Sequence, residues 1–521
     1  MKKIAFALAF AAFVVSCSSI EEDPSSSSGG GNNGDSSSSI GGGGDSSSSI
    51  GGSGNSSSSG GGGNSSSSDG GNDNSSSSGG DSNPSSSSGG SNPSSSSGGG
   101  NPSSSSGGGN PSSSSTGSSP NLWTGFPFDN LNETLPASPN CPDPGQAIEI
   151  TYNNGGAPQI NNPYGSEVSV SSGSGENVVV TLSGDTERNF RLSGTAQNGS
   201  LKVYGGQSRV MLYMNGVNIT KNSGPAINIQ DGRRVTVCLV SGKENYLNGT
   251  SAAPQGDEQA KGAFFSEEKL YFTGNGSLEV KARSSGDPNR NDHAIVVDND
   301  FEMDNGKIII SEAAGDGIHT NDRLEIKGGV IKIASTGDAI QSERDSVIVS
   351  GGKVLAKTTG IKSHGIVSEG STSIRGNARV QISVLGNGSK GIKSTRWAEI
   401  FGGTIAIKAS GDRDGNDADS STAAGIKVGN DDNVFDLFID GGSTTIQSTG
   451  NKAKGINVSG NIDMTRGNID IEAEDDGIKV HGTLKMSGGS ITAASRKSDD
   501  IDYGAITQTG GTINGSSRWT K

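Results

Sequence analysis

Hydrophobic and polar residues follow one short repeated pattern from about residue 290 to the C-terminus. Each unit has a polar residue, a Gly or Ala, an Ile and usually another polar residue, and then two stretches in which apolar and polar residues alternate. The repeated isoleucines are Ile295, Ile318, Ile340, Ile366, Ile392, Ile426, Ile456, Ile478 and Ile501. They are 22 to 34 residues apart. A period of this length with several short strands per unit is typical of a solenoid.

The unit at residues 316–337 shows which elements the pattern predicts. Apolar residues alternate with charged ones at residues 324–326 and again at residues 331–333, which is the periodicity of strands. Gly328 and Gly329 predict a turn between these two strands, and the repeated isoleucine lies in a third short strand. The sequence therefore predicts an all-β fold, a parallel β-helix with three strands and three turns in each rung. An aromatic content of 4% agrees with a core of stacked aliphatic side chains.

The pattern extends less regularly toward the N-terminus. Ala226–Ile227 and Ala263–Phe264 repeat the same phrase, and residues 145–220 are rich in strand-forming sequence, so we expect them to form the first rungs and to cap the open end. A β-sandwich or a β-propeller is the alternative, but propeller blades need about 40 residues and these units are shorter.

Residues 1–17 have the features of an export signal. Lys2 and Lys3 precede an apolar run that is too short to span a membrane permanently, and the run ends at Cys17. A small residue followed by Cys at this distance from the start resembles the bacterial lipoprotein signal, in which Cys17 becomes the lipid-bearing N-terminus. This predicts an exported protein, anchored to the bacterial membrane by its lipid and displayed at the cell surface. An ordinary secretory signal with an incidental cysteine is the alternative.

Residues 18–119 consist mainly of alternating Ser and Gly runs, which predict a disordered linker because they cannot bury apolar surface. Residues 120–521 are long enough for one large, elongated domain, which we expect to be a monomer. The net charge of −15 argues against a nucleic acid as partner. Cys141 and Cys238 could form one disulfide in an exported protein, or remain two buried thiols.

Alignment of the units on the repeated isoleucine brings acidic residues together. Matched positions on neighbouring parallel strands lie about 4.8 Å apart. The carboxylates that this alignment groups are Asp292, Asp316, Asp338, Asp475, Asp476, Asp499 and Asp500. Stacked carboxylates repel one another unless a cation bridges them, and Ca2+ prefers such oxygen ligands, so we predict calcium sites here. The alternative is that each Asp binds the backbone of its own turn.

A row of lysines accompanies these carboxylates, at Lys390, Lys393, Lys427 and Lys479. Bound Ca2+ beside lysines suits a polyanionic sugar, because the ion bridges carboxylates and lysine adds direct ion pairs. Trp397 and Trp519 could stack on sugar rings, although packing explains either. An exposed strand face also commonly carries lysines without any ligand.

The repeated Asp-Gly-Ile phrases, with Gly-Gly between strands, resemble the family of calcium-binding, carbohydrate-binding parallel β-helix proteins first recognised as polygalacturonate binders. The segments Asn189–Gly194, Leu212–Ile219 and Gly224–Ile229 resemble that family's first rungs. The resemblance covers about residues 145–515 and implies a right-handed β-helix that binds acidic plant cell-wall polysaccharide with calcium. It also implies kinship with polysaccharide lyases. The family's acidic position corresponds here to Asp316, Asp338 and Asp476, whereas His364, Lys390, Ala424 and Lys454 replace it in the middle units.

Three functions remain open at this point. The first is a tethered, non-catalytic protein that captures pectin-like chains with calcium. The second is a calcium-dependent lyase, in which Lys390 or Lys393 removes the proton next to the uronate carboxylate. The third is an adhesin or structural surface protein without a sugar ligand.

Overall fold

The computed structural model describes residues 141–415, 421–430 and 432–515. The predictions for the signal at residues 1–17 with Cys17, for the linker at residues 18–119 and for Trp519 lie outside the described residues. Within the described part, no helix is long and apolar enough to cross a membrane.

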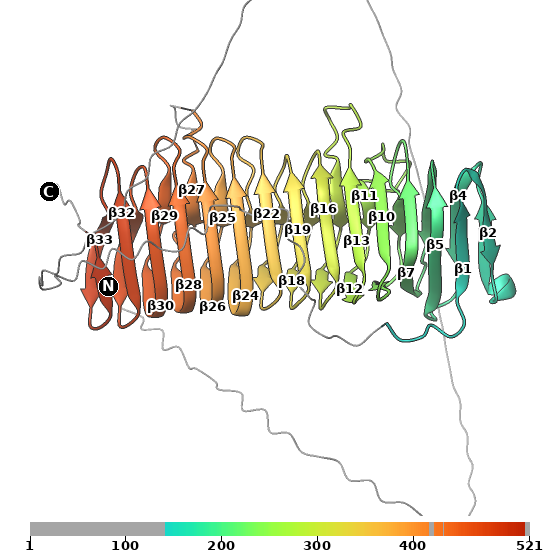
Figure 1. The fold of residues 1–521 in the computed structure, drawn as a ribbon, viewed down its shortest axis with the longest axis horizontal. Coiled ribbons are helices and arrows are strands. Elements are labelled where there is room, and N and C mark those ends of the chain that lie inside the picture. The colour runs from blue at the N-terminus through green and yellow to red at the C-terminus, as the bar shows by residue number, and fades with distance from the viewer. Residues whose placement is uncertain (1–140, 416–420, 431, 516–521) are drawn as a thin grey trace, which may run out of the picture. The chain divides into compact units, whose positions relative to one another are not determined.

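The described residues form 34 hydrogen-bonded strands and one short 3-10 turn. Strands of successive repeats lie side by side in chain order, as Figure 1 shows from β2 to β33. Among the described residues, the paired strands are parallel except in the hairpins β1–β2 and β3–β4 at the N-terminal end. This confirms an all-β chain in which each repeat hydrogen-bonds to the next.

One line of parallel strands carries the repeated isoleucines, and we call it the isoleucine ladder. Its register pairs Ile295 with Ile318, Ile318 with Ile340, and so on to Ile478 with Ile501. Ile227, Phe264 and Ile295 are also in register, so the earlier phrases belong to the same line. The line consists of β4 (Glu176–Leu182), β6 (Gly199–Tyr204), β8 (Ile227–Gln230), β11 (Gly262–Ser266), β14 (His293–Val297), β17 (Ile318–Thr320), β20 (Ile340–Ser342), β23 (Ile366–Ser368), β25 (Lys390–Ser394), β27 (Ala424–Val428), β29 (Lys454–Val458), β31 (Ile478–Met486) and β33 (Ile501–Gln508).

The predicted right-handed parallel β-helix of three-strand solenoid rungs is wrong. Two long strands each join two lines of strands: β7 pairs with both β9 and β10, and β24 pairs with both β21 and β22. As a result, 12 parallel strands form a closed, barrel-like circuit, and the other strands are added to it. In order, the circuit runs through β7 (Arg209–Thr220), β9 (Arg234–Leu239), β12 (Leu270–Gly274), β15 (Phe301–Met303), β18 (Leu324–Ile326), β21 (Val347–Val349), β24 (Thr372–Val384), β22 (Lys353–Thr358), β19 (Val330–Ser335), β16 (Lys307–Ala313), β13 (Ser277–Ala282) and β10 (Glu244–Gly249).

Glycines explain why the uniform three-strand unit fails. The Gly-Gly pairs were predicted as turns between strands, but Gly402 and Gly403 lie inside one strand of 12 residues. Gly403 has a φ of 75°, which only glycine adopts readily, and Gly402 still pairs with Gly376 of the preceding long strand. The chain therefore bends without ending the strand. The later strands on this side are β26 (Ala398–Ala409), β28 (Leu437–Ser448), β30 (Ile462–Ala473), β32 (Ser490–Ser495) and β34 (Thr512–Asn514).

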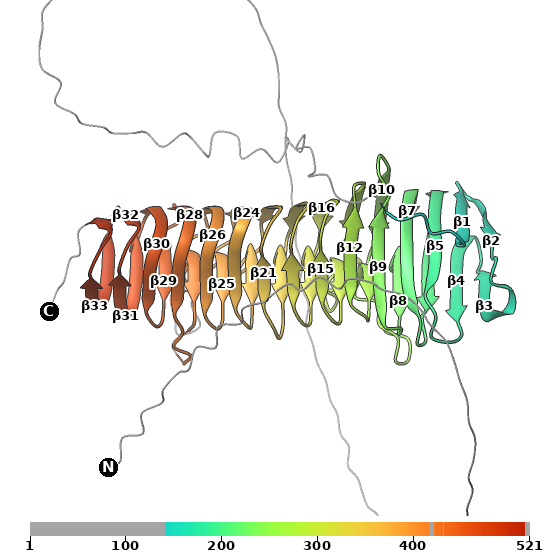
Figure 2. The same ribbon diagram turned by 90° about the horizontal axis from the view of Figure 1, so that it is seen from below.

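The N-terminal end departs from the repeat. Here the chain forms the two antiparallel hairpins, which Figure 2 shows at the end of the row of strands. A disulfide joins Cys141 to Cys238 of β9 across 97 residues. The remaining elements at this end are β1 (Ile148–Asn153), β2 (Gly156–Asn161), the 3-10 turn η1 (Gly165–Glu167), β3 (Val168–Ser172) and β5 (Arg188–Ala196).

The core is a continuous column of buried aliphatic side chains, and glycines in the repeated phrase make room for it. A Cβ on Gly391 would overlap Cγ2 of Ile407. In the same way, a Cβ on Gly365 would overlap Ile382, and one on Gly425 would overlap Ile446. One repeat has Ala339 instead of glycine, and the residue in register with those isoleucines is then the smaller Ala356. At Gly365, Gly391 and Gly425, the absence of a side chain thus leaves room for the opposing isoleucine.

Replacing Gly391 by Ala is therefore expected to destabilise the fold by about 1–3 kcal/mol, because the new methyl group would overlap Ile407 and lie 2.6 Å from the carbonyl oxygen of Gly425. Urea unfolding of Gly391→Ala against the unmodified protein measures this. Gly156→Ala is the matched control, since its new methyl group would meet only ordinary contacts at 3.5 Å or more. Equal stability of the two variants would contradict the packing argument.

Candidate functional site

The residues two positions before the repeated isoleucines lie at the start of the ladder strands, and we call them the capping column. From His293 to His364, each side chain of this column accepts a hydrogen bond from the backbone N–H of the matching residue in the next repeat. The Asp316 amide donates to Nδ1 of His293 at 2.9 Å, and the Asp338 amide donates to Oδ1 of Asp316 at 2.7 Å. The next steps run from the His364 amide to Asp338 and from the Lys390 amide to Nδ1 of His364. One role of the column between His293 and Lys390 is therefore to tie neighbouring repeats together.

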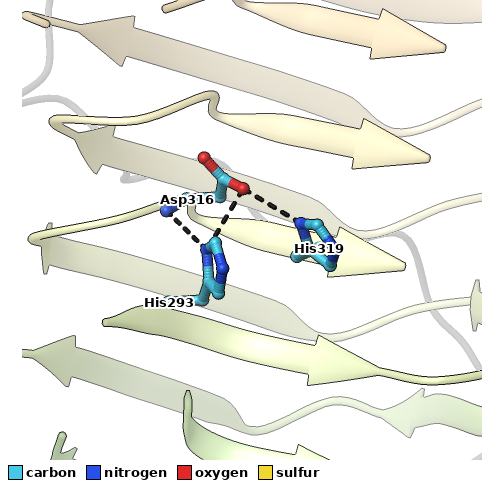
Figure 3. Close-up of side chains that lie close together, drawn as sticks. All are labelled: His293, Asp316 and His319. Carbon is cyan, nitrogen blue, oxygen red and sulfur yellow. Dashed lines mark hydrogen bonds and ion pairs between the residues drawn. The ribbon is translucent and has the colours of Figure 1, made fainter. Parts of the chain in front are cut away.

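Asp316 also lies between two imidazoles (Figure 3). Its Oδ2 is 3.1 Å from Nδ1 of His293 and 3.0 Å from Nδ1 of His319. The two rings are stacked, with centroids 4.7 Å apart. On its other side, Nε2 of His319 is 3.2 Å from Oε1 of Glu343. Three buried side chains from β14, β17 and the segment before β17 thus meet at one point.

Burial and charge shift the pKa values of this group in opposite directions. Burial alone would raise the pKa of Asp316, but the two imidazoles hold it well below its usual range. Burial would lower the pKa of His319, yet the Asp316 carboxylate raises it. For Asp338, burial and the charge of Asp316 outweigh the opposing effects of the His364 amide, Lys393 and His319, and they raise its pKa to about 7. The column therefore holds one carboxylate with a lowered pKa beside one with a raised pKa.

The first three predicted calcium ligands do not offer calcium a suitable set of donors. Asp292 accepts the amide and hydroxyl of Ser251, at 2.8 and 2.6 Å, and the amide of Ser285 at 2.5 Å. Asp316 is engaged by two imidazoles and an amide, and Asp338 accepts the next amide in the column. Calcium prefers six to eight oxygen ligands, whereas the donors gathered at Asp316 include two nitrogens.

The second predicted group offers oxygen donors only. Carboxylate oxygens of Asp476, Asp499 and Asp502 lie within 4.8 Å of one another on neighbouring repeats. Of the other predicted members, Asp475 binds Lys454 at 2.5 Å and Asp500 accepts the Ser495 amide at 2.7 Å. Asp476 also pairs with Lys454 and lies 3.9 Å from Lys479. This donor set fits calcium, and an ion bound there would compete with the lysine ammonium groups.

The four predicted lysines are placed differently from one another. Lys393 pairs in register with Lys427, and Lys479 pairs with Asp502, so these side chains follow one line along the ladder. Lys393 contacts Glu369 at 3.4 Å, and Lys479 contacts Asp502 at 2.7 Å. Lys390 is buried, and its Nζ donates to the carbonyl of Gly388 and to Ser421. Burial and the neighbouring lysines lower the pKa of Lys390 to about 7.

An open cleft of about 330 Å³ adjoins the two imidazoles. Its polar lining includes Lys261, Arg290, His293, His319, Asn321 and Glu343. Most of these side chains come from loops or from the ends of ladder strands. The cleft therefore connects the two imidazoles with solvent.

A family model described as carbohydrate-binding domain-containing protein matches residues 174–450. The chain belongs to this carbohydrate-binding domain family. The matched segment includes the Asp316 group, the cleft, Lys390, Lys393 and Lys427, whereas the oxygen-only group at Asp476 lies beyond it. The central part of the ladder is thus the part that carries the family relationship.

One protein sequence and one solved structure are also similar to parts of this chain. A carbohydrate-binding domain-containing protein of Acetivibrio thermocellus is 30% identical over 126 residues, which cover 23% of this chain and 41% of the relative. This chain therefore spans less than half of that relative's length. A solved structure of a polysaccharide lyase-like protein from C. thermocellum, a gadolinium derivative, is similar with a TM-score of 0.39 and 26% identity, covering 48% of this chain and 94% of that one.

Sequence reasoning placed the columns of this carbohydrate-binding chain but missed three of the residues that meet in them. His319 and Asp502 both occupy the position after the repeated isoleucine, but neither is among the ligands that the sequence predicts. Glu343 follows Ile340 by three residues and gave no pattern of its own. Comparing both columns of adjacent repeats together would have found the first two, because His319 follows Asp316 in the same repeat and Asp502 lies in the repeat after Asp476.

Proposed function

We propose that the chain is a non-catalytic binding protein that captures acidic plant cell-wall polysaccharide of the polygalacturonate type with calcium. The family relationship supports carbohydrate binding. The observation that supports an acidic ligand is the line of Lys393, Lys427 and Lys479, which ends at Asp476, Asp499 and Asp502. Adjacent positions in this line are about 4.8 Å apart.

Each part of this line has a distinct role in the proposal. The lysines form direct ion pairs with sugar carboxylates. Asp476, Asp499 and Asp502 hold calcium, which supplies the positive charge that a second carboxylate of the same polysaccharide needs. Trp397 is 39% exposed near the start of β26 and offers an apolar face to a sugar ring.

The proposal includes attachment to the membrane by a lipid on Cys17, with residues 18–119 as a spacer between the lipid and the carbohydrate-binding domain. Detergent partitioning of the protein made in bacteria tests this part. The unmodified chain is expected in the detergent phase and Cys17→Ser in the aqueous phase. The same partitioning for both would contradict lipid attachment.

Affinity electrophoresis through gels that contain polygalacturonate tests sugar binding. We expect retardation with Ca2+ and much less with a chelator. Replacing Lys393, Lys427 and Lys479 together by Gln is expected to weaken binding roughly tenfold, since each exposed ion pair contributes about 0.2–1 kcal/mol.

The matched control replaces Lys332, Lys353 and Lys408 by Gln, which removes the same charge from strands outside the isoleucine ladder. Equal losses in both triple variants would show that net charge alone matters and would contradict a defined site. No retardation under any condition would leave the adhesin or structural function.

A lyase is the second candidate, because Lys390 has a pKa of about 7, as a proton-accepting lysine requires. Its Nζ is directed to Gly388 and Ser421 rather than to the surface, which favours the binding function. Release of unsaturated uronate product, followed by ultraviolet absorbance during the same binding experiment, distinguishes the two. Product that disappears in Lys390→Gln would establish the lyase.

A further inference from the structure

We propose that His293, Asp316 and His319 bind one divalent transition-metal ion of the zinc class, at a site separate from the proposed calcium site. One ligand atom from each residue lies within 4.8 Å of the other two, and all three residues are buried (Figure 3). Imidazole nitrogens with one carboxylate are a donor set that zinc and its neighbours prefer over calcium.

The spacing of the donors fits such an ion. Ligands at 2.0–2.1 Å in tetrahedral geometry lie about 3.3 Å from one another. The carboxylate oxygen Oδ2 of Asp316 is 3.1 Å from Nδ1 of His293 and 3.0 Å from Nδ1 of His319. Only small movements of these side chains would place all three at bonding distance from a shared centre.

The contacts of His293 also support a bound cation. Its Nδ1 accepts the Asp316 amide and also faces the Asp316 carboxylate oxygen. An imidazole nitrogen carries either one lone pair or one proton, so it cannot satisfy both contacts. A cation between Nδ1 and Oδ2 turns the second contact into coordination, and the Asp316 amide then gives up its bond to Nδ1.

The surroundings supply the two features that a metal centre needs beyond its ligands. Nε2 of His319 is 3.2 Å from the Glu343 carboxylate, and ligating histidines usually donate their second ring N–H to such a group. The adjoining cleft, with Lys261 and Asn321 in its lining, gives the ion an entry path. It also leaves a fourth position for water or for an oxygen of a ligand.

Titration of the full-length protein with Zn2+ against a background of Ca2+, followed by calorimetry, tests the proposal. We expect one ion per chain in the presence of excess Ca2+. His319→Gln should weaken zinc binding by more than 100-fold, and Glu343→Gln by roughly 10- to 100-fold, because Glu343 only orients His319. The matched control is His481→Gln on β31, which should keep the affinity unchanged.

Two further readouts keep the test decisive if His319→Gln folds poorly. Co2+ bound to the unmodified protein should give a visible spectrum of a tetrahedral site with nitrogen ligands, and zinc should shift the amide resonance of Asp316. Glu343 is 48% exposed, so its variant is expected to fold. Equal zinc affinity in the His319, Glu343 and His481 variants, or a cobalt spectrum of oxygen ligands only, would overturn the proposal. Because no sugar is present, failure of polygalacturonate binding leaves this result unaffected.

Discussion

Loss of the disulfide between Cys141 and Cys238 is expected to lower the free energy of unfolding by roughly 4–5 kcal/mol. The bond closes a loop of 97 residues, and a cross-link across so long a loop strongly restricts the unfolded chain. Cys238 is fully buried in β9, so the bond fastens the segment before β1 to the interior of the sheet. Urea unfolding of Cys141→Ser/Cys238→Ser against the unmodified protein measures the effect.

Treatment with a reductant provides the control. The unmodified protein should lose stability on reduction to the level of the double variant, and the double variant should not change further. Zinc affinity and polygalacturonate binding should be retained, because their residues lie on β14 and later strands. Equal stability with and without the bond would show that the first strands are held by packing alone.

Phe272→Ala is expected to destabilise the protein by about 3–5 kcal/mol. Phe272 is fully buried on β12, with its ring centroid 6.2 Å from that of Phe264 and 5.5 Å from that of Phe301. Truncation would leave a cavity between the rings of Phe264 and Phe301 in a core that is otherwise mainly aliphatic. The midpoint of urea unfolding, measured at constant temperature, tests this expectation.

Phe401→Ala is the matched control, because Phe401 is 45% exposed on β26. Its loss should change the free energy of unfolding by no more than about 0.5 kcal/mol. Hydrogen exchange of the β12 and β15 amides would show whether the Phe272 cavity loosens only nearby repeats, since each repeat contacts mainly its neighbours. A Phe272 effect as small as that of Phe401 would contradict the role of the aromatic group.

The strand register could be predicted from the sequence because one residue type marks it. Each repeated isoleucine is buried, and the alternation of apolar and polar residues fixes which side chains face the core. Alignment on Ile318 and Ile340 therefore placed Asp316 and Asp338 on neighbouring repeats, as their backbone-to-side-chain bond shows. The capping column follows from the same alignment.

The continuity of the strands could not be predicted in the same way. A Gly-Gly pair ends a strand between β18 and β19, whereas Gly402 and Gly403 bend one inside β26. The difference depends on whether the ladder of hydrogen bonds continues through the bend, and that depends on the neighbouring strand rather than on the local sequence. In β24 the strand likewise continues past Gly376, whose φ is 63°, so that one strand pairs with both β21 and β22 and closes the circuit where the sequence suggested separate rungs.

The groups that surround each candidate-site carboxylate could not be predicted from the sequence either. Asp316 and Asp476 occupy equivalent positions, but Asp316 faces two histidines and Asp476 faces lysines and other carboxylates. The residues that make the difference come from the second column and from loops. A pattern based on one column therefore predicted the same ion for two chemically different surroundings.

The Cys141–Cys238 disulfide also determines how a mechanical load enters the folded chain. A pull on the residues that precede Cys141 passes across the covalent bond to Cys238, so residues 142–237 are bypassed and bear none of it. The first strand to carry the load is β9, which is hydrogen-bonded on both edges, to β7 and to β12. Peeling from the first residue, strand by strand, is thereby prevented, and the hairpins at the N-terminal end are protected from tension.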